Sequence, residues 1–242
     1  MQTPTKILII GNGMVGHHFV EQMRQSDANA HITVLCGEAN LAYDRVYLSS
    51  VFDGKTAADL ALTTFDNYQQ LNINVHTNQW VNEIDKTNKV VSTQTGDKFN
   101  YDKLILATGS YPFVPPIKGN DQPHCLVYRT LEDLEQIKAS AAQSKSGVVI
   151  GGGLLGLEAA NAIKQLGLDT HVVEFAPQLM AVQLDEQGGT LLKNKIEKLG
   201  VSVHTAKATS EIVKGETRRY RLNFSDDTFL ETDLILFSAG IR

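Results

Sequence analysis

The sequence is poor in cysteine: Cys36 and Cys125 are its only two, and they lie 89 residues apart. This spacing excludes a Cys-x-x-Cys redox pair and any site in which four cysteines bind zinc or an iron–sulfur cluster. We favour two buried free thiols in a reducing compartment, and a single disulfide between the two residues is the alternative.

The chain also lacks an excess of basic residues and a long apolar run. Its 22 Lys and Arg residues against 27 Asp and Glu residues give a net charge of −5. That balance argues against nucleic-acid binding, because such binding depends on neutralising phosphates. No apolar run approaches the roughly 18 residues of a membrane-spanning helix. No signal peptide is evident before Lys6, so we expect a cytoplasmic protein without membrane association.

The rest of the composition is ordinary for a globular protein. Of 242 residues, 42% are hydrophobic and 20% are charged, which permits one large domain or two small ones. The 19 glycines are informative through their positions rather than their number.

Two segments about 140 residues apart resemble each other, Lys6–Met23 and Ser146–Gly167. Each has a short apolar run, a glycine cluster and then apolar residues at helical spacing. A further β-like run follows each segment, at His31–Leu35 and at Thr170–Val173. The repeat predicts an α/β protein with two Rossmann-like dinucleotide-binding lobes.

Short strand-like runs follow each unit, so we expect a small antiparallel β-meander in each lobe. The expected strands are Val75–Trp80, Val81–Asp85, Lys89–Thr93, Phe99–Asn100, Val201–Ala206, Ile212–Lys214, Tyr220–Asn223 and Leu230–Thr232. Three prolines within residues 110–116 favour a stiff connector. We therefore place one lobe in residues 1–115 and the other in residues 116–242. Thr130, with Asp133 three residues later, predicts the start of a helix.

The first glycine loop matches G-x-G-x-x-G and reads Gly11-Asn12-Gly13-Met14-Val15-Gly16. Gly11 would permit the tight turn, Gly13 the approach of a pyrophosphate, and Gly16 close packing of helix and strand. Glu38 lies 22 residues past Gly16, where a carboxylate can accept hydrogen bonds from a ribose. The strand, helix and spaced acid together predict dinucleotide binding, whereas the loop alone is compatible with a glycine-rich turn.

The second loop repeats the pattern and reads Gly151-Gly152-Gly153-Leu154-Leu155-Gly156. Glu174 follows 18 residues past Gly156, and a carboxylate there suits a ribose 2′-hydroxyl and repels a 2′-phosphate. Phe175–Pro177 offers no Arg to receive such a phosphate, so we expect NAD rather than NADP. Without the loop before it, Glu174 would be interpreted as an exposed acid at a strand end.

Two dinucleotide sites in one chain indicate electron transfer between two cofactors, a reaction that needs no protein nucleophile. No nucleophile motif or metal-binding spacing appears, so we assign neither catalytic residues nor a metal site. The adjacent His17 and His18 are interpreted as packing and solvent-facing residues rather than ligands. The spacing alone does not say which loop binds which cofactor.

The chain resembles the pyridine nucleotide–disulfide oxidoreductase superfamily. The matching stretches are the two glycine loops, Ala107-Thr108-Gly109 and Ser238-Ala239-Gly240. Within that superfamily it is similar to the N-terminal region of the large subunit of bacterial NAD(P)H-dependent nitrite reductase. This similarity rests on strings such as AYDRVYLSS, LATGSYPFVPPIKG and EFAPQLMAVQLD.

The resemblance implies roles for particular residues. The first loop and Glu38 would hold FAD, and the second loop with Glu174 would hold NADH. Further cofactor contacts are implied for Arg45, Val81, Thr108, Gly109, Glu158 and Gly240. Three of these have plainer alternatives: a surface salt bridge for Arg45, core packing for Val81 and a helix-surface acid for Glu158.

The family pattern also implies parts that this sequence does not contain. A third FAD-contacting strand would follow Arg242, so we expect the FAD lobe to be incomplete. The cysteines that would hold an iron–sulfur cluster and siroheme would come later still in the family pattern. We expect the chain to pass electrons from NADH through FAD to a metal centre outside it, without reducing nitrite itself. The alternatives are a rubredoxin- or ferredoxin-type reductase and a nucleotide-binding fragment without turnover. The oligomeric state stays open.

Overall fold

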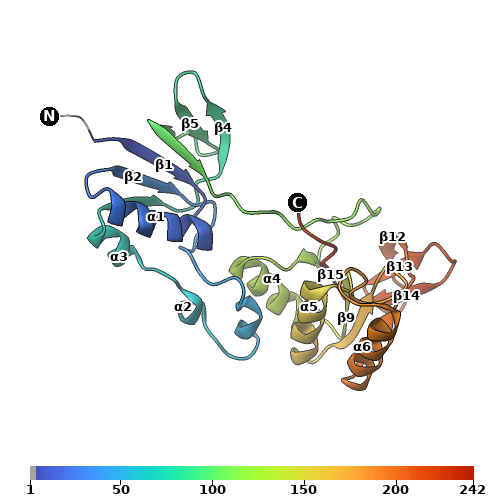
Figure 1. Ribbon diagram of the computed structural model, residues 1–242. Helices are drawn as coiled ribbons and strands as arrows, with labels where there is room; N and C mark the ends of the chain where they lie inside the picture. Colours follow the sequence, from blue (N-terminus) through green and yellow to red (C-terminus); the bar gives the residue numbers. More distant parts are fainter. Residues whose placement is uncertain (1–3) are drawn as a thin grey trace. The chain divides into compact units, whose positions relative to one another are not determined.

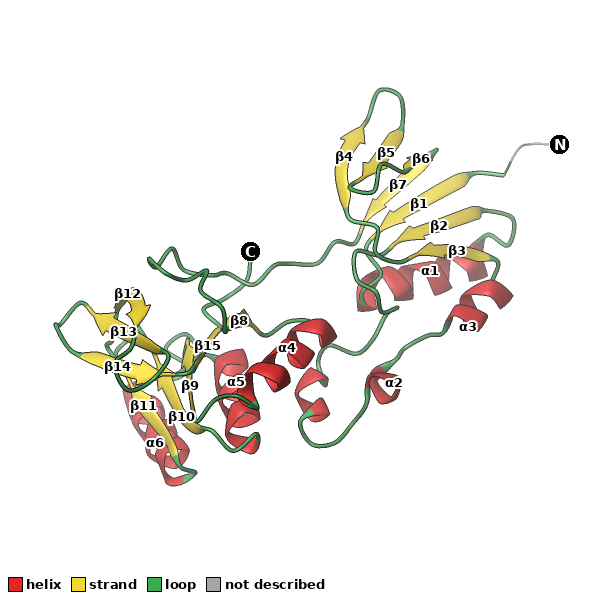
Figure 2. Ribbon diagram, turned by 180° about the vertical axis from the view of Figure 1, so that it is seen from behind, coloured by secondary structure: helices red, strands yellow, loops and turns green. Residues whose placement is uncertain are grey.

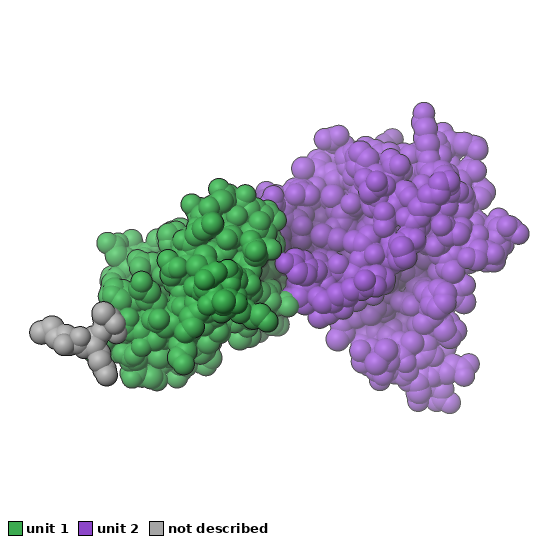
Figure 3. Space-filling model, turned by 90° about the horizontal axis from the view of Figure 1, so that it is seen from above, with its two compact units in different colours: residues 1–51, 55–109 green, residues 52–54, 110–242 purple. Residues whose placement is uncertain are grey.

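A computed structural model describes residues 4–242 of the chain. Residues 1–3, for which no signal peptide was predicted, lie outside the described residues. The chain divides into two compact units (Figure 3). Unit 1 comprises Met1–Val51 and Lys55–Gly109, and unit 2 comprises Phe52–Gly54 and Ser110–Arg242.

Unit 1 begins with the predicted β-α-β arrangement (Figure 1). Its elements are β1 (Lys6–Ile10), α1 (Met14–Ser26), β2 (His31–Leu35), a 3-10 helix at Leu48–Val51, α2 (Ala57–Leu60), α3 (Phe65–Gln70), β3 (Ile73–His76), β4 (Val81–Asp85), β5 (Val90–Thr93), β6 (Lys98–Asn100) and β7 (Lys103–Leu106). Four strands form a parallel sheet in the order β3-β2-β1-β7, and β4, β5 and β6 form an antiparallel meander.

Strand β1 is apolar from Ile7 to Ile10 because both faces of its sheet are covered there. On one face, Ile7 and Ile9 pack with Val20 of α1 and Tyr68 of α3. On the other face, Leu8 and Ile10 pack in a cluster that includes Val91 of the meander and Tyr101. Figure 2 shows the helices and the meander on opposite sides of this sheet.

Unit 2 is built on the same plan. Its elements are β8 (Cys125–Val127), α4 (Leu131–Ala141), β9 (Ser146–Ile150), α5 (Leu154–Gln165), β10 (Asp169–Val173), α6 (Glu186–Lys198), β11 (Val201–His204), β12 (Thr209–Lys214), β13 (Tyr220–Phe224), β14 (Phe229–Thr232) and β15 (Leu234–Phe237). The parallel sheet has the order β11-β10-β9-β15-β8, and β12, β13 and β14 form the second meander.

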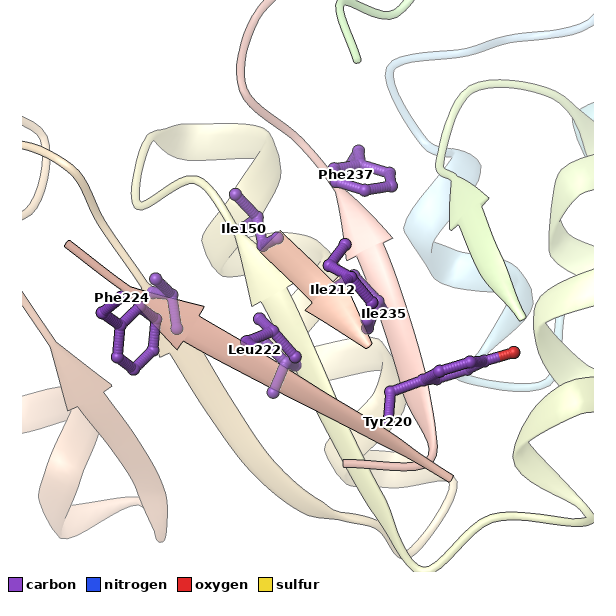
Figure 4. Close-up of a cluster of buried hydrophobic side chains, with 9 residues drawn as sticks. Ile150, Ile212, Tyr220, Leu222, Phe224, Ile235 and Phe237 are labelled. Atoms are coloured by element: carbon purple, nitrogen blue, oxygen red, sulfur yellow. The ribbon is translucent and has the colours of Figure 1, made fainter. Parts of the chain in front are cut away.

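One core cluster of unit 2 lies between this sheet and its meander. Ile150, Ile235 and Phe237 of the sheet pack against Ile212 and Leu222 of the meander (Figure 4). Each fully buried side chain of this kind contributes about 1.5–3 kcal/mol relative to an exposed one. The cluster therefore fixes the strand ends β9 and β15, which carry the second glycine loop and the segment Ser238-Ala239-Gly240.

The predicted α/β class with two parallel sheets and two antiparallel meanders is confirmed. The helix start at Thr130 is also confirmed, because the Asp133 N–H donates to Thr130 Oγ1 over 3.1 Å and the Thr130 N–H to Asp133 Oδ2 over 2.8 Å. One expected meander strand was wrong. The run predicted as Val75–Trp80 overlaps β3 (Ile73–His76) only at Val75 and His76, and β3 pairs in parallel with β2, with Val34 opposite Val75. Strand β8 was missed.

The two units separate at Gly109 and Ser110, at the start of the proline connector. The short segment Phe52–Gly54 belongs to unit 2 because its side chains contact that unit. The Phe52 ring stacks on Tyr128 with a centroid distance of 6.2 Å, and Asp53 Oδ1 accepts a 2.8 Å hydrogen bond from Gln165. The assignment of residues 1–115 to FAD binding and of residues 116–242 to NAD binding stays a prediction.

Candidate functional site

The first glycine loop contains two glycines that the protein itself requires. Gly11 has a φ of +106°, and a Cβ there would lie 2.1 Å from the carbonyl oxygen of Ala107. A Cβ on Gly16 would lie 2.2 Å from the carbonyl oxygen of Gly11. Both distances are far inside van der Waals contact, so any side chain would push the strand, turn and helix apart.

Gly13, between them, is different. A Cβ at this position would meet no atom of residues 4–242 within 4 Å, and its φ of −83° is open to any residue. Nothing in the described protein therefore explains the glycine. A group bound against the backbone, such as the pyrophosphate of a dinucleotide, would explain it.

The second glycine loop has the same division of roles. Gly151 has a φ of +121°, and its Cβ would lie 2.2 Å from the carbonyl oxygen of Ser238. A Cβ on Gly156 would lie 2.0 Å from the carbonyl oxygen of Gly151. At Gly153 the space is again open to 4 Å among the described residues. The two loops thus match in geometry as well as in sequence.

The helices that follow these loops begin without side-chain caps. Gly13 and Gly153 are the N-cap residues of α1 and α5, and neither helix start has a side-chain cap hydrogen bond. The other described α-helices are capped by the side chains of Thr56, Thr64, Thr130 and Asp185. Uncapped N–H groups at a helix N-terminus attract anions such as phosphate.

The remaining loop positions also correspond between the two units. Met14 and Val15 at the start of α1 are exposed to 37% and 74%, and Leu154 and Leu155 at the start of α5 to 59% and 45%. Apolar side chains left open beside an anion-binding helix end suit the apolar parts of a nucleotide cofactor.

Glu38 follows β2 and is engaged by two side chains of the next loop. Its Oε2 accepts a 2.8 Å hydrogen bond from the Tyr43 hydroxyl, and its Oε1 forms an ion pair with Arg45. The Arg45 guanidinium also lies over the Tyr43 ring, 4.7 Å from its centroid. The structure therefore brings Glu38 and Arg45 together in the salt bridge that was the alternative for Arg45. Their contacts to a cofactor stay predictions.

Glu174 follows β10 at the corresponding place in unit 2, but backbone groups hold it. The N–H of Gly152 donates to Oε2 over 2.5 Å, and the N–H of Ala176 donates to Oε1 over 2.7 Å. Each carboxylate oxygen keeps a further lone pair. The carboxylate is thus fixed beside the glycine loop with acceptor capacity left for a ligand hydroxyl.

A cavity of about 750 Å³ adjoins this carboxylate and the second glycine loop. Its lining includes six predicted site residues, Gly151, Gly153, Leu154, Leu155, Glu174 and Gly240. It also includes residues that sequence reasoning missed, among them Phe113, Arg129, Phe175 and Lys207. A mostly apolar lining with a few polar groups is typical of cofactor sites.

The predicted residues outside the loops have varied positions. Thr108 and Gly109 are exposed directly after β7, at the same sheet edge as the first glycine loop. Val81 is half-buried against the Leu8 cluster, as the core-packing alternative requires. Glu158 is exposed on α5 and does not line the cavity. The cofactor contacts of Thr108, Gly109, Val81 and Glu158 stay predictions.

A buried polar chain behind the first loop was also missed. The Tyr68 hydroxyl donates to Asn12 Oδ1 over 2.7 Å and lies 3.0 Å from His17 Nδ1. All three side chains are at least nine-tenths buried, and burial raises the pKa of Tyr68. Tyr68 comes from α3, 56 residues past Asn12, so no local pattern connects them. His17 is a packing residue and His18 is exposed, as predicted.

Three further features bear on the range of functions. Throughout residues 4–242, no helix combines the length and apolar character needed to cross a bilayer. Among the same residues, no three His, Cys, Asp or Glu side chains are grouped to hold a metal ion. Cys36 and Cys125 are both free thiols as predicted, but only Cys36 is buried, whereas Cys125 is partly exposed.

Comparison with known proteins gives the family. A family model described as pyridine nucleotide-disulphide oxidoreductase matches residues 5–242. The chain belongs to this family. It is 54% identical over 242 residues to the nitrite reductase (NAD(P)H) large subunit of Klebsiella oxytoca. This match covers 99% of this chain and 25% of the Klebsiella protein. It is 52% identical over 240 residues to the nitrite reductase (NADH) large subunit of Escherichia coli, covering 98% and 28%.

The fold of this oxidoreductase is also found among solved structures. A ferredoxin reductase from Rhodopseudomonas palustris has a TM-score of 0.89 at 26% identity, covering 98% of this chain and 59% of that one. The chain spans about a quarter of the length of the two nitrite reductase relatives. The family resemblance predicted from the motifs is therefore confirmed, whereas the activity of those whole proteins belongs to a proposal.

Proposed function

We propose that the chain is the NADH-oxidising, FAD-reducing part of an assimilatory nitrite reductase. The observation that carries this proposal is the identity of 52–54% with nitrite reductase large subunits over nearly the whole chain. The geometry of the two glycine loops supports it as well, because the space beside Gly13 and Gly153 is free of described protein atoms.

Unit 1 would hold FAD and unit 2 would hold NADH. Bound together, these groups would supply the redox chemistry, with a hydride passing from the reduced nicotinamide to the flavin. The residues of the chain would bind and orient them: the N–H groups at the starts of α1 and α5 would receive the pyrophosphates. Glu38 and Glu174 would accept hydrogen bonds from the riboses.

A preference for NADH over NADPH is part of the proposal. The fixed carboxylate of Glu174 would accept a hydrogen bond from the 2′-hydroxyl and repel a 2′-phosphate. Electrons would pass on to a siroheme and iron–sulfur centre outside these 242 residues.

The test is NADH oxidation by the purified chain with excess FAD and an artificial electron acceptor such as ferricyanide. We expect oxidation that depends on added FAD, and no reduction of nitrite. NADH binding without oxidation at saturating FAD would instead support the alternative of a nucleotide-binding fragment. No binding of either cofactor would contradict both.

A second candidate is a rubredoxin- or ferredoxin-type reductase, favoured by the likeness to the ferredoxin reductase fold. The same assay separates the two functions when rubredoxin or ferredoxin replaces the dye. Rapid reduction of one of these proteins would favour the second candidate.

A further inference from the structure

Lys207 lies in the loop after β11, and backbone hydrogen bonds fix that loop beside Glu174. The Glu174 N–H donates to the His204 carbonyl over 2.8 Å, and the Lys207 N–H donates to the Glu174 carbonyl over 3.0 Å. Between them, the Ala206 N–H donates to the Ala176 carbonyl over 2.8 Å. The Lys207 side chain therefore starts next to the residue proposed to read the nucleotide 2′ position, and it lines the same cavity.

The ammonium of Lys207 is bound by the turn between β13 and β14. It forms an ion pair with Asp226 and a 2.8 Å hydrogen bond to Thr228 Oγ1. It also lies 5.4 Å from the centroid of the Phe224 ring. Two of its three N–H donors are thus engaged by side chains of the meander turn.

Asp226 is itself held in place for this contact. Its Oδ1 accepts hydrogen bonds from the Thr228 hydroxyl over 2.6 Å and from the Thr228 N–H over 3.2 Å. The ammonium of Lys207 holds the pKa of Asp226 at about 2, so the carboxylate is charged at neutral pH. Asp226 therefore carries its negative charge opposite the Lys207 ammonium under the conditions in which a nucleotide would bind.

A site that accepts NADPH needs a cation for the 2′-phosphate. Lys207 has a flexible four-carbon stem and begins beside Glu174, so its ammonium is suited to that task once it is released. The other cation of the cavity lining, Arg129, donates to Ser110 Oγ over 2.7 Å. Asp226 is thus placed to compete with a nucleotide 2′-phosphate for the Lys207 ammonium.

We propose that Asp226 is a specificity-determining residue of the second site: it binds the Lys207 ammonium and so withholds that charge from a nucleotide 2′-phosphate. The selection of NADH over NADPH would then depend on two acids, Glu174 by direct repulsion and Asp226 through Lys207. This inference rests on the proposed function of unit 2 in binding NADH.

The test compares dissociation constants for NADH and NADPH, measured by calorimetry at low ionic strength on the full chain with added FAD. Asp226→Asn keeps the oxygen that accepts from Thr228 but removes the charge that holds Lys207. We expect NADPH to bind about threefold more tightly to this variant, the size of one partly exposed charge contact. NADH, which has no 2′-phosphate, should change by less than about twofold.

Three further variants make the comparison decisive. Asp227→Asn removes the same charge one residue away, at a φ of +63° that Asn accepts, and should leave NADPH binding unchanged. Adding Lys207→Gln to Asp226→Asn should abolish the gain. Asp226→Ala removes the charge with a different side chain and should reproduce it, so the test survives if Asp226→Asn does not fold.

Each contrary outcome has a distinct meaning. Normal NADH binding with unaltered NADPH binding in both Asp226 variants would overturn this inference alone. An equal gain in Asp227→Asn, or a gain that persists without Lys207, would also overturn it, because net charge would then explain the effect. Failure of the native chain to bind NADH would overturn the proposed function, and this inference with it.

Discussion

The backbone N–H of Gly152 donates a 2.5 Å hydrogen bond to the carboxylate of Glu174 and thereby joins the second glycine loop to the end of β10. A Cβ on Gly152 would lie 3.0 Å from Glu174 Oε2 and 2.6 Å from Leu179 Cδ2. The loop and the acid are therefore packed as one unit, and the carboxylate has a fixed place relative to the start of α5.

Glu174→Gln is expected to weaken NADH binding about tenfold, because a hydrogen bond to a charged acceptor contributes roughly 1.5–3 kcal/mol. The same change should narrow the difference between the dissociation constants for NADH and NADPH, because the charge that repels the 2′-phosphate is gone. Calorimetric dissociation constants for both nucleotides measure each effect. Glu135→Gln, on the exposed side of α4, removes the same charge outside the cavity and serves as the control. Equal affinities of the native chain for both nucleotides would contradict the role of Glu174.

Gly153→Ala and Gly156→Ala are expected to separate binding from stability. At Gly156 the new methyl group would meet the Gly151 carbonyl oxygen at 2.0 Å, so we expect a loss of about 1–3 kcal/mol in the free energy of unfolding. At Gly153 it would meet no described atom within 4 Å, so stability should change by less than about 0.5 kcal/mol. NADH binding should nevertheless weaken at least about tenfold for Gly153→Ala, because the methyl group would occupy the place of the pyrophosphate. Denaturant unfolding and calorimetry measure the two quantities, and unchanged binding would count against a dinucleotide at this loop.

Tyr68→Phe is expected to destabilise unit 1 by about 1–3 kcal/mol, because Asn12 and His17 would lose their buried partner. The measurement is denaturant unfolding, with Tyr101→Phe as the matched control. Tyr101 is also buried in unit 1, and its hydroxyl has no hydrogen bond to the described part of the chain. Equal effects of the two substitutions would show that the chain from Asn12 to His17 adds nothing to stability.

The glycine loops could be predicted from sequence because the turn from strand to helix is local, although Gly11 and Gly151 also pack against Ala107 and Ser238, which are distant in the sequence. Gly11, for example, requires a positive φ directly after β1, and Gly16 meets the Gly11 carbonyl five residues earlier. The strand-end acids follow from the same local plan, since one helix and one strand separate each from its loop. Such features repeat with the βαβ unit and can be found by spacing.

What could not be predicted depends on contacts between distant segments. The four-residue β3 gives no local sign of whether it joins the parallel sheet or the meander, and its pairing with β2 decides the matter. Lys207 reaches Asp226 only through the register of β12, β13 and β14. Tyr43 reaches Glu38 only through the fold of the loop after β2. None of these pairings has a period or motif in the sequence.

Glu231 on β14 makes unit 2 sensitive to acid. The backbone N–H of Glu216 and the hydroxyl of Thr217 donate to its carboxylate and hold its pKa at about 2, below the ordinary value of 4.5. Because the folded-state pKa is the lower one, the stabilisation is fully present above about pH 4.5 and is lost as the pH falls toward 2. Glu231→Gln should therefore lower the unfolding temperature at pH 7 and flatten its fall between pH 5 and pH 3. Thermal unfolding monitored by circular dichroism across this range measures the effect. Glu186→Gln, at an acid in the first turn of α6, serves as the matched control. A native and a Glu231→Gln curve that run parallel from pH 7 to pH 3 would mean that Glu231 titrates alike in the folded and unfolded chain.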